Sequence, residues 1–313
     1  MKRHSLAAMA LFLCSGFSYG REPCVWQVAR DPRLATDVQA LRMAEQLLVR
    51  HASQDSPLAS SRLREALRIL ERADAAHSPD PRVRFLYGRL LTRSERHEQA
   101  LRVLSAAIDE APDHPSVADA LFSLAICHAS LGRTQEEIAA YQRLLQRQWV
   151  PERRSIVQSN LAESLMFVGR IEEAIQTYRE AIATDDGNIL ARWGLAVALD
   201  RAGDSMGAFE QVNEALVRDP LADELDNPLV FFVPAYDRFW YFALWAMSRA
   251  HGEHDALLRA DHWQAAAQYW QRYIEAAPAE DRWVAVARVR RDQCVRSLGM
   301  VHRRAHPRKG TPR

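Results

Sequence analysis

The sequence predicts an all-α protein built from repeated antiparallel helix pairs, and three observations support this fold class. A short glycine turn recurs between predicted helices, as Leu131-Gly132-Arg133, Val168-Gly169-Arg170 and Ala202-Gly203-Asp204. Small and bulky apolar residues stand at fixed distances from each turn, at the spacing of one helix face. Prolines such as Pro112 and Pro220 follow the second helix of a unit, where the missing N–H and the fixed φ help to end a helix.

The turns set the period of the repeat. A glycine that follows a helix can adopt the left-handed conformation that closes it. A fourth unit aligns with Glu95 in place of glycine, and the four turns then stand 37, 37 and 34 residues apart. A recurrence of this length is typical of repeats made of one helix pair each.

Two further sets of residues keep the same register. Seven residues before each turn the side chain is small, so that two antiparallel helices can approach closely. Along one face of the second helix, bulky and small residues alternate. The small residues before the turn are Gly88, Ala125, Ala162 and Ala196. In the second helix, the residues nine after the turn are Leu104, Tyr141, Tyr178 and Val212, and those twelve after it are Ala107, Leu144, Ala181 and Ala215.

These residues resemble the tetratricopeptide repeat family over four units, residues 81–220. The sequence departs from the family pattern at Glu95, Glu137, Trp149 and Asp186. The resemblance implies a right-handed superhelical solenoid of antiparallel helix pairs. It also implies a concave surface, lined mainly by the first helix of each pair, that binds peptides or protein segments.

The solenoid is expected over residues 34–300, as about six helix pairs and a capping helix at 282–299. Outside the best repeats, degenerate pairs are expected at 34–76, where Asp31-Pro32 precedes the first helix, and at 236–278. The capping helix is rich in arginine, which would give the end of the stack a polar face. Its arginines are Arg288, Arg290, Arg291 and Arg296.

The family geometry places certain residues of each first helix on the concave surface. We expect this surface to be apolar with flanking arginines, and to hold a partner segment that has apolar and some acidic residues. In an alternative arrangement, the aromatic rings pack on the neighbouring repeat instead. The predicted partner-binding residues are Arg82, Phe85, Arg89, Arg93, Phe122, Ile126, Phe167, Trp193, Val197 and Arg201.

Aromatic residues are densest between Leu229 and Met247. Pro234, Asp237 and Arg238 exclude a membrane span there, as does the short length. Large rings can fill a wide junction where the period changes. Alternatively, they form a secondary patch that contacts a partner or a glycan, and its residues would be Tyr236, Phe239, Trp240 and Trp245.

The N-terminus is typical of a secretory signal peptide, residues 1–20. Lys2 and Arg3 precede an apolar stretch from residue 6 to 17, and small residues then stand at the two places that a signal peptidase reads. We expect a periplasmic or secreted protein with an extended linker at 21–33 and a basic disordered tail at 301–313, which could contact cell wall or membrane. An outer-membrane lipoprotein attached at Cys14 is the alternative, although Leu13 stands where a small residue is required.

Export would permit a disulfide between Cys24 and Cys294, but free or intermolecular thiols are expected because the two lie near opposite ends of the predicted stack. No paired-cysteine metal motif occurs. A cluster of histidine and carboxylate in the loop from His251 to His262 leaves open a metal-binding protein or hydrolase as an alternative function.

The balance of charge and the motifs narrow the function. With 41 Lys and Arg against 40 Asp and Glu, the chain has no overall field for nucleic acid. No nucleophile elbow, phosphate-binding loop or dinucleotide fingerprint occurs, so neither an enzyme nor a cofactor is expected. The sequence predicts a non-catalytic scaffold of a bacterial cell-envelope assembly, such as a secretion, pilus, motility or outer-membrane machine. A glycan- or peptidoglycan-binding module is a further alternative.

Overall fold

A computed structural model describes residues 30–49, 57–227, 230, 232 and 234–305. The predicted signal peptide lies outside the described residues, as do Cys14, Cys24 and residues 306–313 of the predicted tail. Residues 301–305 of that tail are helical, and so are residues 32 and 33 of the predicted extended linker, which corrects both predictions. The described part of the chain contains helices and their connections, without a β-strand. It forms two compact units, one that ends at Gln148 and one that begins at Trp149.

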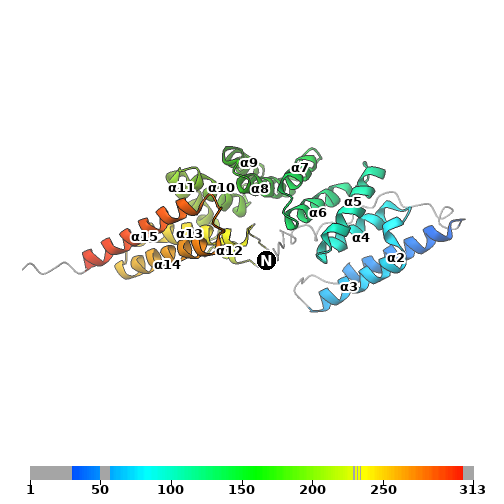
Figure 1. Cartoon of the computed structure of the whole chain (residues 1–313), viewed down its shortest axis with the longest axis horizontal. Helices are drawn as coiled ribbons and strands as arrows, with labels where there is room; N and C mark the ends of the chain where they lie inside the picture. Colours follow the sequence, from blue (N-terminus) through cyan, green and yellow to red (C-terminus); the bar gives the residue numbers. More distant parts are fainter. Residues whose placement is uncertain (1–29, 50–56, 228–229, 231, 233, 306–313) are drawn as a thin grey trace, which may run out of the picture. The chain divides into compact units, whose positions relative to one another are not determined.

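The first unit consists of three successive helix pairs (Figure 1). Each pair is closed by a short connection, so its two helices run antiparallel. The helices are α2 (Pro32–Val49), α3 (Pro57–Arg72), α4 (Pro81–Arg93), α5 (His97–Glu110), α6 (Val117–Ser130) and α7 (Thr134–Leu145), with a 3-10 turn η1 (Ala75–His77) between α3 and α4.

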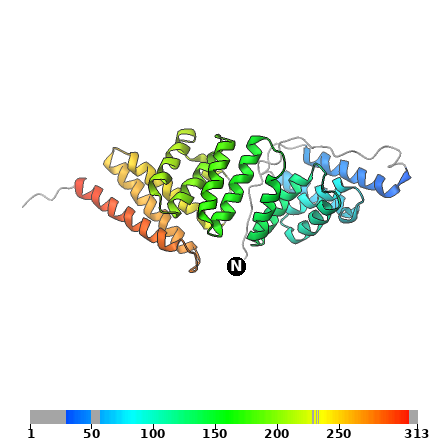
Figure 2. The same ribbon diagram turned by 90° about the horizontal axis from the view of Figure 1, so that it is seen from above.

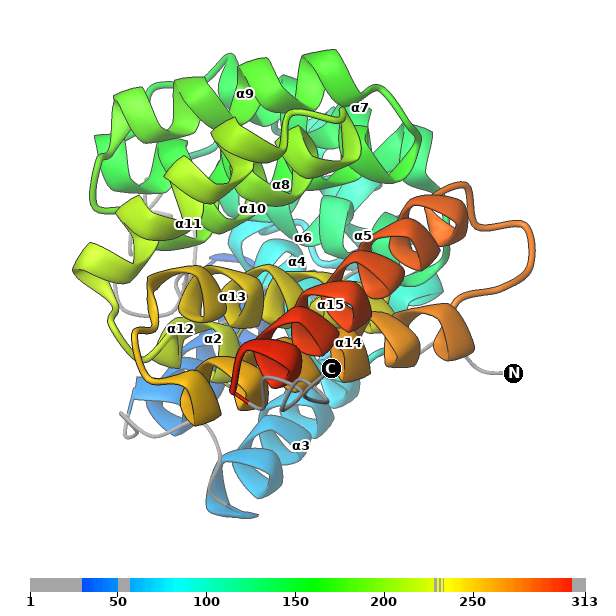
Figure 3. The same cartoon turned by 90° about the vertical axis from the view of Figure 1, so that its left-hand side faces the viewer.

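The second unit begins with two more such pairs and ends with a further pair and one last helix. Figure 2 shows its successive helices side by side. In Figure 3, α13, α14 and α15 lie together at the C-terminal end. The helices are α8 (Pro151–Phe167), α9 (Ile171–Thr184), α10 (Ile189–Arg201), α11 (Ser205–Arg218), the short α12 (Asp223–Asp226), then α13 (Arg238–Gly252), α14 (Ala256–Ala276) and α15 (Val284–Ala305), with a 3-10 turn η2 (Ala235–Asp237) before α13.

The left-handed conformation predicted for the turns is confirmed at all four positions. The φ angles of Gly132, Gly169 and Gly203 are 71°, 83° and 92°, and Glu95 has a φ of 59°. After each turn, the next backbone N–H donates to the carbonyl five residues earlier, as from Arg96 to Leu91 at 3.0 Å. This 6→1 bond is the mark of a Schellman closure, so Glu95 fills the role that glycine fills in the other repeats.

The small residues before the turns allow the close helix approach that the sequence predicts. A Cβ placed on Gly88 would lie 2.4 Å from Cδ2 of Leu104, so α4 and α5 touch where this glycine stands. Ala125, Ala162 and Ala196 are fully buried at the equivalent positions. The repeat pattern in the sequence therefore marks the core of both units.

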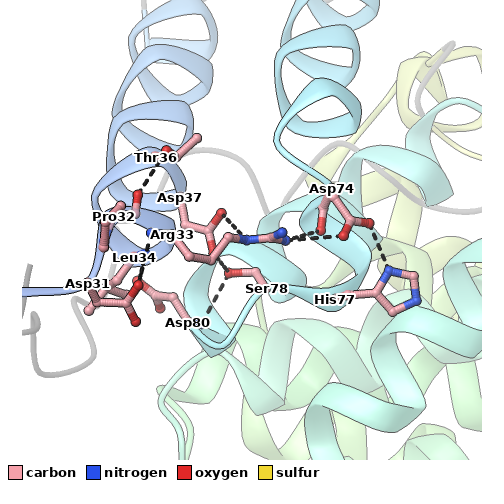
Figure 4. Close-up of polar contacts among 10 residues, drawn as sticks. All are labelled: Asp31, Pro32, Arg33, Leu34, Thr36, Asp37, Asp74, His77, Ser78 and Asp80. Atoms are coloured by element: carbon pink, nitrogen blue, oxygen red, sulfur yellow. Dashed lines mark hydrogen bonds and ion pairs between the residues drawn. The ribbon is translucent and has the colours of Figure 1, made fainter.

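A polar cluster joins α2 to the connection before α4 (Figure 4). The Arg33 guanidinium donates to the backbone carbonyl and the carboxylate of Asp74, at 3.0 and 3.2 Å. The carboxylate of the fully buried Asp37 lies 3.3 Å from Nε of Arg33 and accepts a hydrogen bond of 2.5 Å from the Ser78 hydroxyl. Asp31 accepts from the backbone N–H of Arg33 at 2.9 Å, as an N-cap does. These contacts fix the first helix to the repeats that follow.

One of the four arginines of the last helix does not lie on the expected polar face. Arg288 and Arg296 are exposed, but the Arg290 side chain turns inward and lies 2.5 Å from Asp200 of α10. Val289 and Val295 are exposed on the same helix. No helix in the described ranges has both the length and the apolar composition of a membrane span.

Candidate partner-binding surface

Two arginines lie one helical turn apart on α4 of the first unit. Nη1 of Arg89 is 3.2 Å from Oδ2 of Asp119, on α6. Arg93 is half-buried and has no carboxylate partner among the residues that the structure describes. Burial lowers the pKa of Arg93, and the positive charge of Arg89 lowers it further. The pair therefore holds one positive charge that the described part of the protein does not neutralise.

Asp119 is a member of this site that the sequence analysis missed. It stands thirteen residues before Gly132, and Arg82 stands thirteen residues before Glu95, so the two occupy the same place in successive repeats. The alignment of the turns could have identified it. Arg82 itself is held by Asp80, whose carboxylate lies 2.7 to 3.1 Å from the guanidinium nitrogens.

The predicted aromatic and apolar residues of the surface are buried. Phe85 is 1% exposed, Phe122 3% and Trp193 0%. Phe85 stacks on His114 at 5.0 Å, and Phe122 meets Tyr141 edge-on at 6.1 Å. Phe85 therefore packs on the connection between α5 and α6, and Phe122 on the second helix of its own repeat, so neither ring is open to a partner. Ile126 and Val197 are buried in the same way.

Arg201, at the end of α10, is also withdrawn from solvent. Its guanidinium lies 2.9 Å from Asp237 and 4.5 and 5.3 Å from the rings of Trp240 and Trp283. Burial raises the pKa of Asp237, and the adjacent Arg201 opposes that shift. The short contact identifies an ion pair inside the protein. Of the predicted surface residues in the second unit, only Phe167, 39% exposed at the end of α8, is open to a partner.

Of the four residues of the secondary aromatic patch, Trp240 is part of the core and the other three are half-buried. Trp240 is fully buried, meets Trp270 edge-on at 4.8 Å and donates from Nε1 to Asp200 at 3.1 Å. The Tyr236 hydroxyl donates to Asp281 at 2.8 Å. Phe239 and Trp245 are half-buried. Trp240 and Tyr236 pack against Trp270 and Tyr273 of α14, so Trp240 offers no surface to a glycan.

The loop from His251 to His262 uses its polar groups locally. The His251 ring lies between Phe209, at 5.2 Å, and Trp263, at 4.9 Å. The Asp255 carboxylate accepts from two backbone N–H groups at the start of α14. Across the described ranges, no three His, Cys, Asp or Glu side chains are placed to hold a metal ion. The loop geometry therefore gives the metal-binding alternative no support.

The two described cysteines are buried thiols. Burial raises the pKa of Cys127 to about 11 and that of Cys294 to about 12. A protonated, buried thiol is a poor nucleophile. Both cysteines act as small core residues.

Two tetratricopeptide repeat models match the chain, one at residues 58–121 and the other at residues 94–149 and 159–223. No curated protein matches it. Among solved structures, the chain is similar to MamA, from residue 41 onward, of Desulfovibrio magneticus RS-1, with 15% identity, a TM-score of 0.50, and coverage of 60% of this chain and 97% of that one.

YrrB, described as a tetratricopeptide repeat protein with an unusual peptide-binding site, has 15% identity and a TM-score of 0.49; the match covers 64% of this chain and 95% of that one. At these identities the likeness concerns the fold alone. The predicted all-α solenoid of antiparallel helix pairs is confirmed. The family models together cover half of the sequence, and the chain belongs to the tetratricopeptide repeat family.

Proposed function

We propose that the protein is a non-catalytic scaffold that binds an acidic segment of a partner protein on the α4–α6 face of its first unit. The observation that carries this proposal is the half-buried guanidinium of Arg93, beside Arg89 and without a carboxylate of its own in the described part of the chain. Asp119 neutralises Arg89, so a negative charge from a partner could neutralise Arg93.

A carboxylate is the ligand that this arrangement favours. The guanidinium is planar and can donate two parallel hydrogen bonds to a carboxylate. A hydrogen bond to a charged group contributes about 1.5–3 kcal/mol, and partial burial reduces screening by solvent. A partner carboxylate on Arg93 would also relieve the repulsion from Arg89. Binding should therefore weaken as ionic strength rises.

A displayed library of random peptides, selected on the purified protein, tests this proposal. Selected peptides should be enriched in Asp, Glu or a free C-terminal carboxylate. Arg93→Gln should weaken their binding by about tenfold or more, which corresponds to the loss of one charged hydrogen bond. Arg102→Gln, an exposed arginine on α5, is the matched control and should bind like the unaltered protein. Peptides that bind Arg93→Gln as tightly as the unaltered chain would rule out this site.

We also propose that the scaffold works outside the cytoplasm, in a cell-envelope assembly such as a secretion, pilus, motility or outer-membrane machine. Support comes from the basic residues, the apolar stretch and the small residues of the first 20 positions. Cell fractionation and mass spectrometry of the mature N-terminus test this. A mature protein that begins at Arg21 supports export, one that begins with a lipidated Cys14 identifies the lipoprotein, and a cytoplasmic protein that retains Met1 contradicts both.

A further inference from the structure

The last described helix, α15, has an exposed side that carries apolar residues. Its opposite side packs on α14, and Ala287 and Cys294 are fully buried there (Figure 3). On the exposed side, the exposed fractions of Val289, Val295 and Met300 are 61%, 53% and 48%. Contact with an apolar phase would remove these side chains from water, and the transfer of apolar surface out of water is favourable.

The same side of α15 carries arginines. Arg288, Arg296 and Arg303 are exposed, and no carboxylate in the described part of the chain forms an ion pair with any of them. Asp292, the one acidic residue of this helix, is neutralised by Arg291, whose Nη2 lies 2.8 Å from its carboxylate. The exposed side is therefore both basic and apolar. Its basic–apolar face consists of Arg288, Val289, Val295, Arg296, Met300 and Arg303.

Positive charge is concentrated in this part of the sequence. Residues 296–313 contain six Lys or Arg and no Asp or Glu. The rest of the chain has 35 Lys and Arg against 40 Asp and Glu. An anionic surface would therefore attract this end of the chain more strongly than any average part of it, which would orient the protein as it approaches.

A bilayer with anionic lipid is the partner that fits both kinds of side chain. Its phosphate groups accept hydrogen bonds from guanidinium groups, and aliphatic side chains can enter the acyl boundary about 5–10 Å deep. A nucleic acid would leave the aliphatic residues without a use, and α15 has no Phe, Tyr or Trp on which a base could stack. A second copy of the chain would bring two basic faces together across a two-fold interface.

We propose that the basic–apolar face of α15 docks the protein on the surface of a bilayer that contains anionic phospholipid. The helix lies along the bilayer and stays packed on α14. Its arginines contact phosphate groups, and Val289, Val295 and Met300 enter the acyl boundary. Arg89 and Arg93 belong to the first unit, so this surface is independent of the site for an acidic segment.

Co-sedimentation of the full chain with vesicles of equimolar phosphatidylglycerol and phosphatidylcholine tests the proposal. Each cation near an anionic surface strengthens binding by about fivefold, so Arg296→Gln with Arg303→Gln should weaken it by about 25-fold. The matched control, Arg64→Gln with Arg102→Gln, removes two exposed arginines of the first unit and should bind like the unaltered protein. Residues 1–20 are the same in every variant, so their contribution is common to all. Equal loss in the two double variants overturns the proposal.

A second pair of variants separates insertion of the face from attraction by charge alone. Val295→Ser with Met300→Ser keeps every charge and should weaken vesicle binding by about tenfold, because two side chains no longer enter the acyl boundary. Val217→Ser with Met206→Ser changes two exposed residues of α11 and should bind like the unaltered protein. Unchanged binding of the α15 variant would show that the face does not enter the bilayer, which contradicts the proposal.

The choice of ligand identifies the class of partner. Vesicles of phosphatidylcholine alone should bind weakly, and higher ionic strength should weaken binding to the mixed vesicles. Arg93→Gln should bind the mixed vesicles like the unaltered protein even if it no longer binds acidic peptides. Binding to polyglutamate but not to the mixed vesicles would assign the face to an acidic protein and overturn the proposal.

Discussion

Glu95 stands where the other three aligned turns have glycine, and replacing it by glycine should stabilise the first unit. Its φ of 59° lies in the left-handed region. An L-residue with a side chain loses about 1–2 kcal/mol there. Glycine avoids this loss but has about 0.5–1 kcal/mol more conformational entropy to lose on folding. The expected net gain in the free energy of unfolding is about 0.5–1 kcal/mol.

Other effects of the substitution are small. The Schellman bond from Arg96 to Leu91 is already formed, so glycine needs no change of the backbone. Glu95 is exposed, and the loss of its charge near His97 is worth little at the surface. Glu95→Ala removes the same carboxylate but retains the strained φ, which makes it the matched control.

Urea unfolding followed by circular dichroism measures the effect. Glu95→Gly should raise the unfolding midpoint without a change in the slope m, and Glu95→Ala should leave the midpoint close to that of the unaltered protein. The converse substitution, Gly132→Ala, should lower the midpoint, because it introduces strain at a φ of 71°. If Glu95→Gly is no more stable than Glu95→Ala, the strain argument is refuted.

Three further substitutions or conditions probe the core. Arg201→Met should lower the free energy of unfolding by about 3–5 kcal/mol, because it leaves Asp237 buried and unpaired, and adding Asp237→Leu should restore most of the loss in thermal unfolding. Burial lowers the pKa of the half-buried His97, His114 and His128, so the folded state favours their neutral rings. The contribution of these histidines to the free energy of unfolding should be complete above the unfolded pKa of about 6.5 and should decrease at lower pH. Equal urea midpoints at pH 7.5 and about 5.5 would contradict this. Gly88→Ala should lower the free energy of unfolding. Overlap of the new Cβ with Leu104 costs about 1–3 kcal/mol, and the higher helix propensity of alanine offsets about 1 kcal/mol of this. Calorimetry measures the net change.

The local features of the fold were predictable because they depend on a few neighbouring residues. Turn glycines, small residues and helix caps can be predicted from the sequence of a single repeat. Glu95 could be identified as a turn residue from its register alone. The burial of Phe85 depends on neighbours such as His114, in the connection between α5 and α6, which the period does not specify. The contact of Arg290 with Asp200 joins residues 90 positions apart, and no repeat register relates them.

The candidate site was predictable in part for the same reason. Arg89 and Arg93 follow from their places before the turn, and so would Asp119. The contacts of Arg201 within its own chain could not be predicted from the repeat register, because Asp237 and Trp283 lie outside the four best repeats.

The adjacent residues Asp200 and Arg201 connect the end of α10 to the C-terminal part of the chain. Asp200 accepts hydrogen bonds from Arg290 and Trp240, and Arg201 pairs with Asp237. Repeat arrays change length by duplication of whole units. A unit inserted after α11 would separate this acid–base pair from the helices that receive it, unless its own first helix also ended in Asp-Arg. The residues two positions before the four aligned turns are Arg93, Ser130, Phe167 and Arg201, and aspartate precedes only Arg201. A unit added ahead of α10 would leave these contacts in place, so the contacts of Asp200 and Arg201 constrain only the C-terminal end of the array.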